Sequence, residues 1–288
     1  MSNSRILPEF DLLVPQSVSE AVDMAARYGD KAAVLAGGTD LMIMLQKGTA
    51  TPDYIIALGE IDDLDYIKYS KSDGLRIGAL TTITQLIDNS TVKKNYPALW
   101  QACKSHSAPQ IRNVATPLGN IMRASPSGDC SCALLALGAR VVLEGAKGRR
   151  EVLLDDFFIG YAKTARKADE IAVEILLPAV QNGLTSSFVR LTRTNFDLSK
   201  INMAVQLDMS GKTCNEARIA VGAVAPTTIR AKKAEALLKG AKITDELIKK
   251  VGSAIAKEIK PIDDVRSTAE YRREVSAVLA ERAIKACL

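Results

Sequence analysis

Apolar positions in the first third of the chain form one helical pattern and two short runs. The segment "SVSEAVDMAARYG", residues 17–29, has apolar residues at helical spacing. Ser17 and Glu20 have the spacing of a capping box, and Gly29 is a suitable helix end. The runs "AAVLAGG" (residues 32–38) and "DYIIAL" (residues 53–58) are short enough for strands. The pattern therefore predicts one helix followed by two strands.

Hairpins and further helices are predicted over the next 120 residues. The segments "YIKYSKSDGLRIGAL" (66–80), with Asp73-Gly74 in its turn, and "RVVLEGAKGRREVLL" (140–154) are typical of hairpins. Thr82 and Gln85 form a second capping box, and "ALLALGA" (133–139) favours a helix. The run "DEIAVEILLP" (169–178) predicts a strand that Pro178 ends.

The pattern changes after "AVQNGLTSS", where Asn182-Gly183 marks a turn. Three strands are predicted beyond it, at "SFVRLTR", "MAVQLDMS" and "ARIAVGAV", and three helices follow, at residues 227–239, 245–260 and 270–286. This order predicts an α+β region up to Pro178 and a smaller module at residues 183–288.

Composition narrows the classes of function. The 288 residues suffice for roughly two domains. The net charge is +5, but Lys and Arg are interspersed with Asp and Glu, so no basic block points to nucleic acid. No apolar stretch is long enough to span a bilayer, and "MSNSRILPEFDLLVP" lacks the regions of a signal peptide. We therefore expect a soluble, cytoplasmic protein that binds no nucleic acid.

Histidine and cysteine content restricts the chemistry. His106 is the single histidine, which nearly excludes a Ser-His-Asp triad and metal sites built on paired histidines. Five cysteines, an odd count, argue against a disulfide framework. Cys103, Cys130 and Cys132 are too few for a four-cysteine iron–sulfur site, so no metal ligands are assigned. We interpret Cys130 and Cys132 as small apolar residues that begin a buried helix, with a redox role as the alternative.

Two glycine turns are candidates for binding something polar. In "VLAGGTDLM", residues 34–42, a strand runs into Gly37-Gly38 and exposes consecutive backbone N–H groups that suit anionic oxygens. The alternative is a plain turn from a strand to a helix. No G-x-G-x-x-G pattern follows the strand, so the turn is not the dinucleotide fingerprint.

The second candidate is "VATPLGNIMRASPSGD", residues 114–129, whose irregular composition predicts either a surface loop or a cradle. Gly119 permits close backbone approach, and Asn120 can donate and accept hydrogen bonds. Asp129 has the chemistry to bind ribose or ribityl hydroxyls. Two such turns in one region favour a dinucleotide without identifying it.

These segments resemble the flavin subunit of the molybdenum hydroxylases. The resemblance runs through "AGGTDL", "QIRNVATPLGNIMRASPSGD", "FFIGYAKTARKADEIAVEILLP", "ARIAVGAVAPTTIRAKKAEALLKG" and "PIDDVRSTAEYRREVSAVLAERA", nearly the whole chain in order. The family includes the medium subunits of carbon monoxide dehydrogenase and hydroxybenzoyl-CoA reductase, and the central domain of xanthine dehydrogenase.

The resemblance implies a fold and a function. It implies an α+β, two-subdomain FAD-binding fold of the vanillyl-alcohol-oxidase type at residues 1–178, with subdomains at about 1–60 and 61–178. A C-terminal domain with a small antiparallel sheet and helices would occupy residues 183–288. The implied function is electron transfer through FAD between iron–sulfur clusters of a small subunit and an external acceptor or donor such as NAD. A large subunit would carry the molybdenum cofactor and the substrate chemistry. The alternative is a flavin-free assembly module with the same fold.

The resemblance also implies a flavin site. The pyrophosphate would lie on the first turn, and the second turn, Asp129, the end of the "DEI" strand and an arginine, Arg190 or Arg193, would complete the site. The implied cofactor-binding residues are Val34, Leu35, Ala36, Gly37, Gly38, Thr39, Asp40, Leu41, Ala115, Thr116, Gly119, Asn120, Asp129, Ile171, Ala172 and Arg190.

Six further positions carry open interpretations. Pro117 and Leu118 depart from the family's pattern, because Pro117 lacks an N–H and Leu118 replaces a glycine. If that position requires a positive φ, Leu118 would be strained by roughly 1–2 kcal/mol. His106 either approaches the flavin ring or has no chemical role. Tyr271 and its neighbours Arg272 and Arg273 are structural or belong to a subunit interface.

Overall fold

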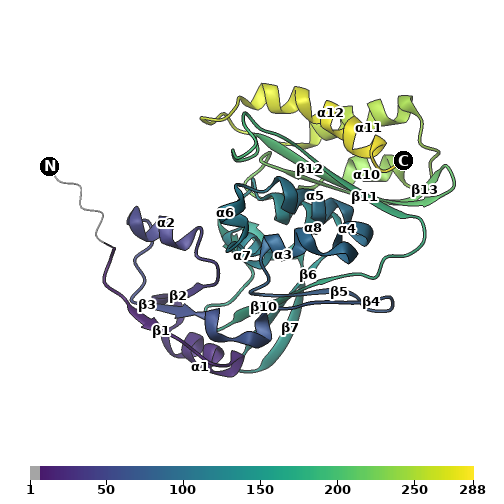
Figure 1. The fold of residues 1–288 in the computed structure, drawn as a ribbon. Coiled ribbons are helices and arrows are strands. Elements are labelled where there is room, and N and C mark those ends of the chain that lie inside the picture. Colours follow the sequence, from purple (N-terminus) through teal and green to yellow (C-terminus); the bar gives the residue numbers. More distant parts are fainter. Residues whose placement is uncertain (1–6) are drawn as a thin grey trace.

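A parallel three-stranded sheet forms the first subdomain of the computed structural model, which describes residues 7–288 (Figure 1). The predicted subdomain starts at residue 1, so its first six residues lie outside the described part. The sheet has the order β1-β3-β2. Its elements are β1 (Asp11–Leu13), α1 (Val18–Tyr28), η1 (Gly29–Lys31), β2 (Ala32–Leu35), α2 (Leu41–Gln46), β3 (Tyr54–Ala57), η2 (Leu58–Glu60) and η3 (Asp62–Leu64).

The predicted start and end of α1 are confirmed. The Ser17 hydroxyl accepts a hydrogen bond from the Glu20 N–H, and Gly29 follows the helix with φ 51°. The second bond of the predicted capping box is displaced by one residue. The Glu20 carboxylate accepts a hydrogen bond from the N–H of Gln16 and not from that of Ser17. Ala21, Val22 and Ala25 are the buried positions of the helix, as their spacing predicts.

An antiparallel five-stranded sheet of order β4-β5-β10-β6-β7 forms the second subdomain. Both predicted hairpins are present, and the predicted strand at 169–178 lies between them at the centre of the sheet, where six of its seven residues are buried. The strands are β4 (Ile67–Ser70), β5 (Gly74–Gly78), β6 (Arg140–Gly145), β7 (Gly148–Leu153) and β10 (Ile171–Leu177).

Helices between β5 and β6 cover this sheet. The Thr82–Gln85 capping box begins the first of them as predicted. The helices are α3 (Ile83–Asp88), α4 (Ser90–Asn95), α5 (Pro97–Ser105), α6 (Pro109–Arg112), α7 (Pro117–Arg123) and α8 (Asp129–Ala136). A short connection of α9 (Leu154–Phe157), β8 (Phe158–Gly160) and β9 (Lys163–Thr164) leads back to β10.

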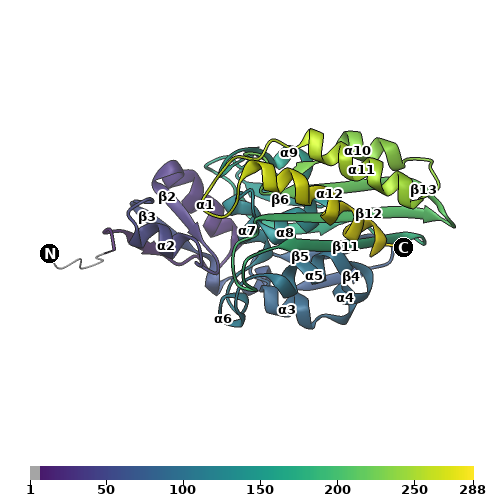
Figure 2. The same cartoon turned by 90° about the horizontal axis from the view of Figure 1, so that it is seen from above.

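The C-terminal domain is a four-stranded antiparallel sheet covered on one side by three helices (Figure 2). Its elements are β11 (Leu184–Leu191), β12 (Ile201–Ser210), β13 (Thr213–Gly222), β14 (Ile229–Arg230), α10 (Lys232–Leu238), α11 (Asp245–Glu258) and α12 (Ala269–Lys285). The predicted helix at 227–239 is wrong in its first part, because Ile229 and Arg230 pair with β13 before the helix begins. The predicted boundary at residues 178–183 falls between β10 and β11.

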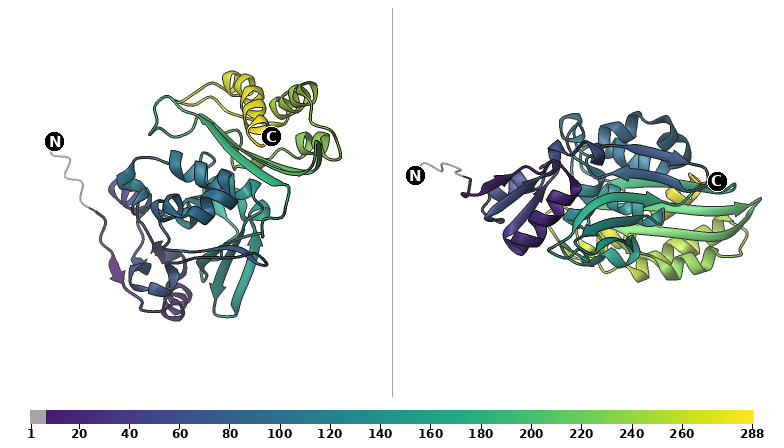
Figure 3. Two further views of the ribbon diagram at one scale, coloured as in Figure 1. Left: turned by 45° about the vertical axis from the view of Figure 1, so that its right-hand side comes forward. Right: turned by 90° about the horizontal axis from the view of Figure 1, so that it is seen from below.

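The C-terminal sheet contributes to two hydrophobic cores because its side chains alternate between its faces. On β12, Met203 and Val205 face the core under α10–α12, whereas Ala204 between them belongs to the core of the first two subdomains. Helix α8 is buried throughout and packs against β12 and β13. Figure 3 shows the first subdomain as a lobe at the opposite end of the molecule from the C-terminal residue. Within residues 7–288, no helix is long and apolar enough to cross a membrane.

Candidate functional site

A cavity of about 450 Å³ lies between the first subdomain and the helices that follow β5. Thirteen of the sixteen predicted site residues line it: Val34, Leu35, Ala36, Gly37, Gly38, Thr39, Asp40, Leu41, Ala115, Thr116, Gly119, Asn120 and Ala172. The other three, Asp129, Ile171 and Arg190, are outside its lining. The fold therefore brings the two glycine turns, about 80 residues apart in the sequence, to one space.

The turn after β2 is a row of unpaired backbone donors. Within residues 7–288, no acceptor hydrogen-bonds the N–H groups of the five residues 37–41. Gly38 has φ 72°, which a residue with a side chain rarely adopts. The Asp40 carboxylate lies 3.4 Å from Nε of Arg123. Because a carboxylate repels an anion, Asp40 can bind one only through its backbone N–H. Consecutive free backbone N–H groups of this kind can bind anionic oxygens.

Gly37 has a second role, which only the fold reveals. A Cβ atom at this position would lie 1.8 Å from the carbonyl oxygen of Val114. The first turn and the segment before the second turn therefore touch backbone to backbone. A side chain at residue 37 would separate the two walls of the cavity.

The second turn is more regular than its composition predicts, because residues 117–123 form helix α7. The Thr116 hydroxyl begins this helix by accepting a hydrogen bond from the Gly119 N–H at 2.9 Å. Pro117 occupies the first helical position, where its missing N–H breaks no intrahelical bond. Leu118 is buried within the first turn and is not among the residues with positive φ. The expected strain at Leu118 is therefore wrong.

Ser131 fixes the orientation of the Asn120 side-chain amide. Its Oδ1 accepts from the Ser131 N–H at 3.1 Å and from the Ser131 hydroxyl at 3.0 Å. Because a backbone N–H can only donate, the atom that faces it must be the oxygen. The Asn120 NH₂ group is left to donate toward the cavity that the residue lines.

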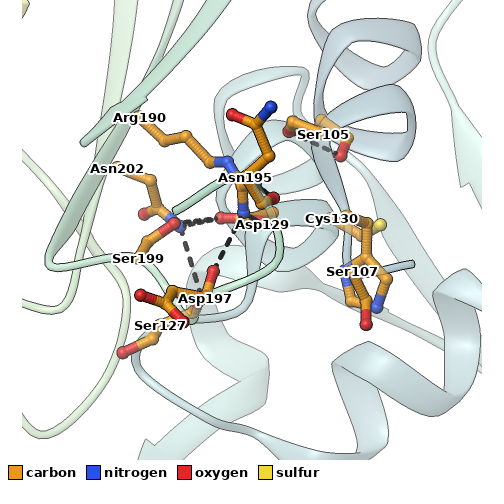
Figure 4. A network of polar contacts seen from close by, with 12 residues as sticks. Ser105, Ser107, Ser127, Asp129, Cys130, Arg190, Asn195, Asp197, Ser199 and Asn202 are labelled. Atoms are coloured by element: carbon orange, nitrogen blue, oxygen red, sulfur yellow. Dashed lines mark hydrogen bonds and ion pairs between the residues drawn. The ribbon is translucent and has the colours of Figure 1, made fainter. Parts of the chain in front are cut away.

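Asp129 is enclosed by partners from the C-terminal domain (Figure 4). Its Oδ1 accepts from the Ser199 hydroxyl and from the Asn202 amide, both at 2.7 Å. Its Oδ2 accepts from Nη1 of Arg190 at 2.9 Å. Arg190 also donates to the carbonyl of Asn195, so the residues after β11 are tied to the start of α8. Arg193 instead pairs with Asp197 and is exposed.

His106 lines the cavity from the loop between α5 and α6. Burial, the largest cause, lowers the pKa of its imidazole below the ordinary value. Asp129 and Asp40 oppose that shift of the pKa, whereas Arg190 and Arg112 add to it. The imidazole is therefore neutral at pH 7.

Comparison with known proteins decides the family. Residues 8–180 match the family described as "FAD binding domain in molybdopterin dehydrogenase", and residues 186–287 match "CO dehydrogenase flavoprotein C-terminal domain". The chain is a FAD-binding medium subunit of the molybdenum hydroxylase family. The resemblance inferred from the sequence is thereby confirmed, as are the cofactor FAD and the assignment to oxidoreductase subunits.

Curated relatives match this flavin subunit over nearly its full length. The carbon monoxide dehydrogenase medium chain of Hydrogenophaga pseudoflava is 34% identical over 281 residues, which are 98% of each chain. The xanthine dehydrogenase FAD-binding subunit of Escherichia coli O157:H7 is 30% identical over 270 residues, 93% of this chain and 92% of that one.

Solved structures show the same fold. Carbon monoxide dehydrogenase from Hydrogenophaga pseudoflava that lacks the Mo-pyranopterin moiety superposes with TM-score 0.94 at 35% identity, covering 98% of both chains. Quinoline 2-oxidoreductase from Pseudomonas putida 86 superposes with TM-score 0.90 at 25% identity, again over 98% of both chains. The predicted fold class is confirmed.

Several lining residues of the flavin subunit are missing from the site predicted from the sequence: Ala32, Ala33, Met44, Leu58, Ala79, His106, Leu118, Met122, Arg123, Ala162 and Arg166. Arg166 is held by three backbone carbonyls, those of Lys167, Ala168 and Glu170. Most of these residues carry no local signal because tertiary folding alone brings them to the cavity. His106, which the sequence leaves open between an approach to the flavin ring and no chemical role, lies in the lining, and so does Leu118.

All five cysteines of the subunit are free and buried. Cys130 and Cys132 lie in the first turn of α8, which confirms their interpretation as small buried residues. The Cys130 sulfur is 3.9 Å from that of Cys103. The side-chain hydrogen bond between Cys130 and Cys103, followed by burial, raises the pKa of the Cys130 thiol, so this thiol is poorly reactive.

Proposed function

We propose that this chain holds FAD across the cavity, with the pyrophosphate between the turn at residues 37–41 and the turn at residues 116–120. The observation that carries this proposal is the row of five unpaired N–H groups in residues 37–41, which line the cavity together with the second turn. Within residues 7–288, the N–H of Leu118 also has no acceptor, and the Asn120 NH₂ group, which has no protein partner, belongs to a residue that lines the same cavity. This donor set fits an anionic group such as a diphosphate.

Charged and buried residues complete the proposed site. Arg123 and Arg166 line the cavity and add positive charge near a bound diphosphate. Ala172 lies against the cofactor, and the fully buried Ile171 supports it from the sheet. Asp129 and Arg190 act from behind the lining, where their ion pair fixes the start of α8.

The proposed role of the subunit is electron transfer. A bound flavin exchanges electrons in pairs or singly, which lets it join a two-electron reaction to one-electron centres. We infer that the partners are an iron–sulfur small subunit and a molybdenum-cofactor large subunit, with NAD or another external acceptor or donor. The names of the relatives, "medium chain" and "FAD-binding subunit", support this assignment.

Exposed apolar side chains support assembly with partner subunits. Phe196 and Leu198 project from the residues after β11, and Ile262 and Val265 from the segment before α12. The two segments are joined through Arg272, which donates to the carbonyls of Lys200 and Ile262. Large apolar side chains on neighbouring loops are typical of protein–protein contacts.

The flavin-free alternative loses its support in the structure, because Pro117 and Leu118 begin an ordinary helical turn. The test is an absorption spectrum of the purified chain, followed by denaturation and quantification of the released cofactor. We expect an oxidised-flavin band and one FAD per chain. A colourless chain that takes up no added FAD would refute the proposal.

The partner assignment needs a separate measurement. The tagged chain is purified from its natural source, and the complex is analysed for FAD, iron and molybdenum. We expect all three to co-purify in a constant ratio. Recovery of the flavoprotein without either metal would contradict the electron-transfer role in a molybdenum complex.

A further inference from the structure

The imidazole of His106 is an unassigned polar group in the wall of the cavity. His106 is the single histidine of the chain. Its main-chain N–H and carbonyl are hydrogen-bonded, but within residues 7–288 neither ring nitrogen has a protein partner. Neither ring nitrogen is a fully buried unpaired atom, so both remain accessible. The ring can therefore donate or accept toward whatever fills the cavity.

The loop that carries His106 is held firmly. The backbone N–H of His106 donates to the Cys103 carbonyl at the end of α5. Nη1 of Arg112 donates to the carbonyls of Lys104, His106 and Ser107. Ser107 has φ 43°, a conformation that a serine adopts only when its surroundings enforce it. The backbone that carries the ring is therefore fixed before any ligand binds.

The charges that face the imidazole are nearly balanced. Asp129 and Arg190 face it from α8 and β11, Asp40 from the first turn and Arg112 from α6. Asp129 pairs with Arg190 at 2.9 Å, and Asp40 lies 3.4 Å from Arg123. Burial is the largest cause that lowers the pKa of the imidazole, and these paired carboxylates do not outweigh it. An additional negative charge in the cavity would favour its protonation, since an opposite charge nearby stabilises the imidazolium form.

We propose that His106 lies against the ring system of the bound FAD and takes up one proton when that ring receives two electrons. This inference rests on the proposed function. Two electrons and one proton leave the flavin with one negative charge, and a second proton from solvent binds the imidazole. The balance is FAD, neutral His106, two protons and two electrons from the iron–sulfur partner or an external donor, giving FADH⁻ and protonated His106. The charge created by reduction is thereby neutralised inside the protein.

The single histidine makes a direct test possible. The full chain, made without a histidine tag and labelled with ¹⁵N-histidine, is titrated by NMR under anaerobic conditions with its FAD oxidised and then reduced. Flavin content is measured first. We expect the protonation midpoint to rise by one pH unit or more on reduction, a tenfold or larger change in proton affinity. An unchanged midpoint with flavin bound overturns this inference alone, whereas a chain that binds no flavin overturns the proposed function as well.

Reduction potentials give a second test. Each proton coupled to a two-electron reduction changes the potential by about 30 mV per pH unit. At pH values between the protonation midpoints of His106 with oxidised and with reduced FAD, the flavin potential should depend on pH more steeply in the wild type than in His106→Asn. We expect the two slopes to differ by about this amount. Lys104→Asn, at an exposed neighbouring position, is the control and keeps the wild-type slope. Equal slopes in wild type and His106→Asn, with flavin bound to both, would overturn the inference.

Discussion

Nη1 of Arg190 donates to Oδ2 of Asp129 over 2.9 Å and joins the first strand of the C-terminal domain to the first turn of α8. The side chains are only 10% and 6% exposed. Ser199 and Asn202 occupy the other carboxylate oxygen. The residue predicted to bind sugar hydroxyls thus connects the two domains.

We predict that Asp129→Ala lowers both stability and flavin content. The substitution leaves Arg190 buried without its partner, and breaking a buried ion pair costs about 3–5 kcal/mol. Urea unfolding monitored by circular dichroism measures the loss, and released FAD reports the site. Asp156→Ala, at an exposed position of α9, is the control. Equal unfolding midpoints for the two variants would disprove the connecting role.

Gly37→Ala is expected to release FAD. The added methyl group would lie 1.8 Å from the Val114 carbonyl oxygen, so the two turns must move apart. We expect at least a tenfold weaker FAD affinity, measured by fluorescence titration of the apoprotein. Gly59→Ala, whose methyl group meets no atom within 4 Å, should bind FAD normally. Wild-type affinity in Gly37→Ala would show that the contact is not required.

Leu118→Gly is expected to destabilise the subunit. The side chain is buried in the first turn of a helix, so its loss combines a cavity with the low helix propensity of glycine. We expect a loss of about 3–5 kcal/mol in thermal or urea unfolding. Leu237→Gly, at an exposed position of α10, should lose only about 1 kcal/mol. Tighter flavin binding in Leu118→Gly would revive the strain hypothesis.

The C-terminal domain should lose stability in acid through Asp264. Burial alone would raise the pKa of this carboxyl, but hydrogen bonds from Arg266 and Arg272 outweigh it and hold the pKa well below its usual range. A depressed folded-state pKa contributes stability above the unfolded-state pKa of about 3.9, and this contribution is lost as the pH falls below that value.

The urea midpoints of wild type and Asp264→Asn should therefore differ at neutral pH and approach each other in acid. At neutral pH the variant should be less stable, because Arg272 is almost fully buried and loses its ion pair. A constant difference between the two proteins down to pH 3 would exclude this carboxyl as the source of acid sensitivity.

Local sequence signals predicted much of the fold because the responsible interactions are short-range. The Thr82–Gln85 capping box and the Asp73-Gly74 turn satisfy backbone groups within a few residues, so each is visible in the sequence. The segment at residues 227–231 was predicted wrongly, since Ile229 becomes a strand only by pairing with Val221 of β13. Partners distant in the sequence outweigh local propensity there.

The sequence by itself determined that two glycine-containing segments could bind something polar, the first through consecutive backbone donors, and the order of motifs identified the flavin family. Only the tertiary structure decided that Gly37 touches Val114, that Arg190 forms an ion pair with Asp129, and that His106 lines the cavity. The physical reason is the separation along the chain over which each interaction acts. Glycine conformation and helix capping depend on neighbours in the chain, whereas contacts, burial and charge pairing depend on segments that only folding brings together.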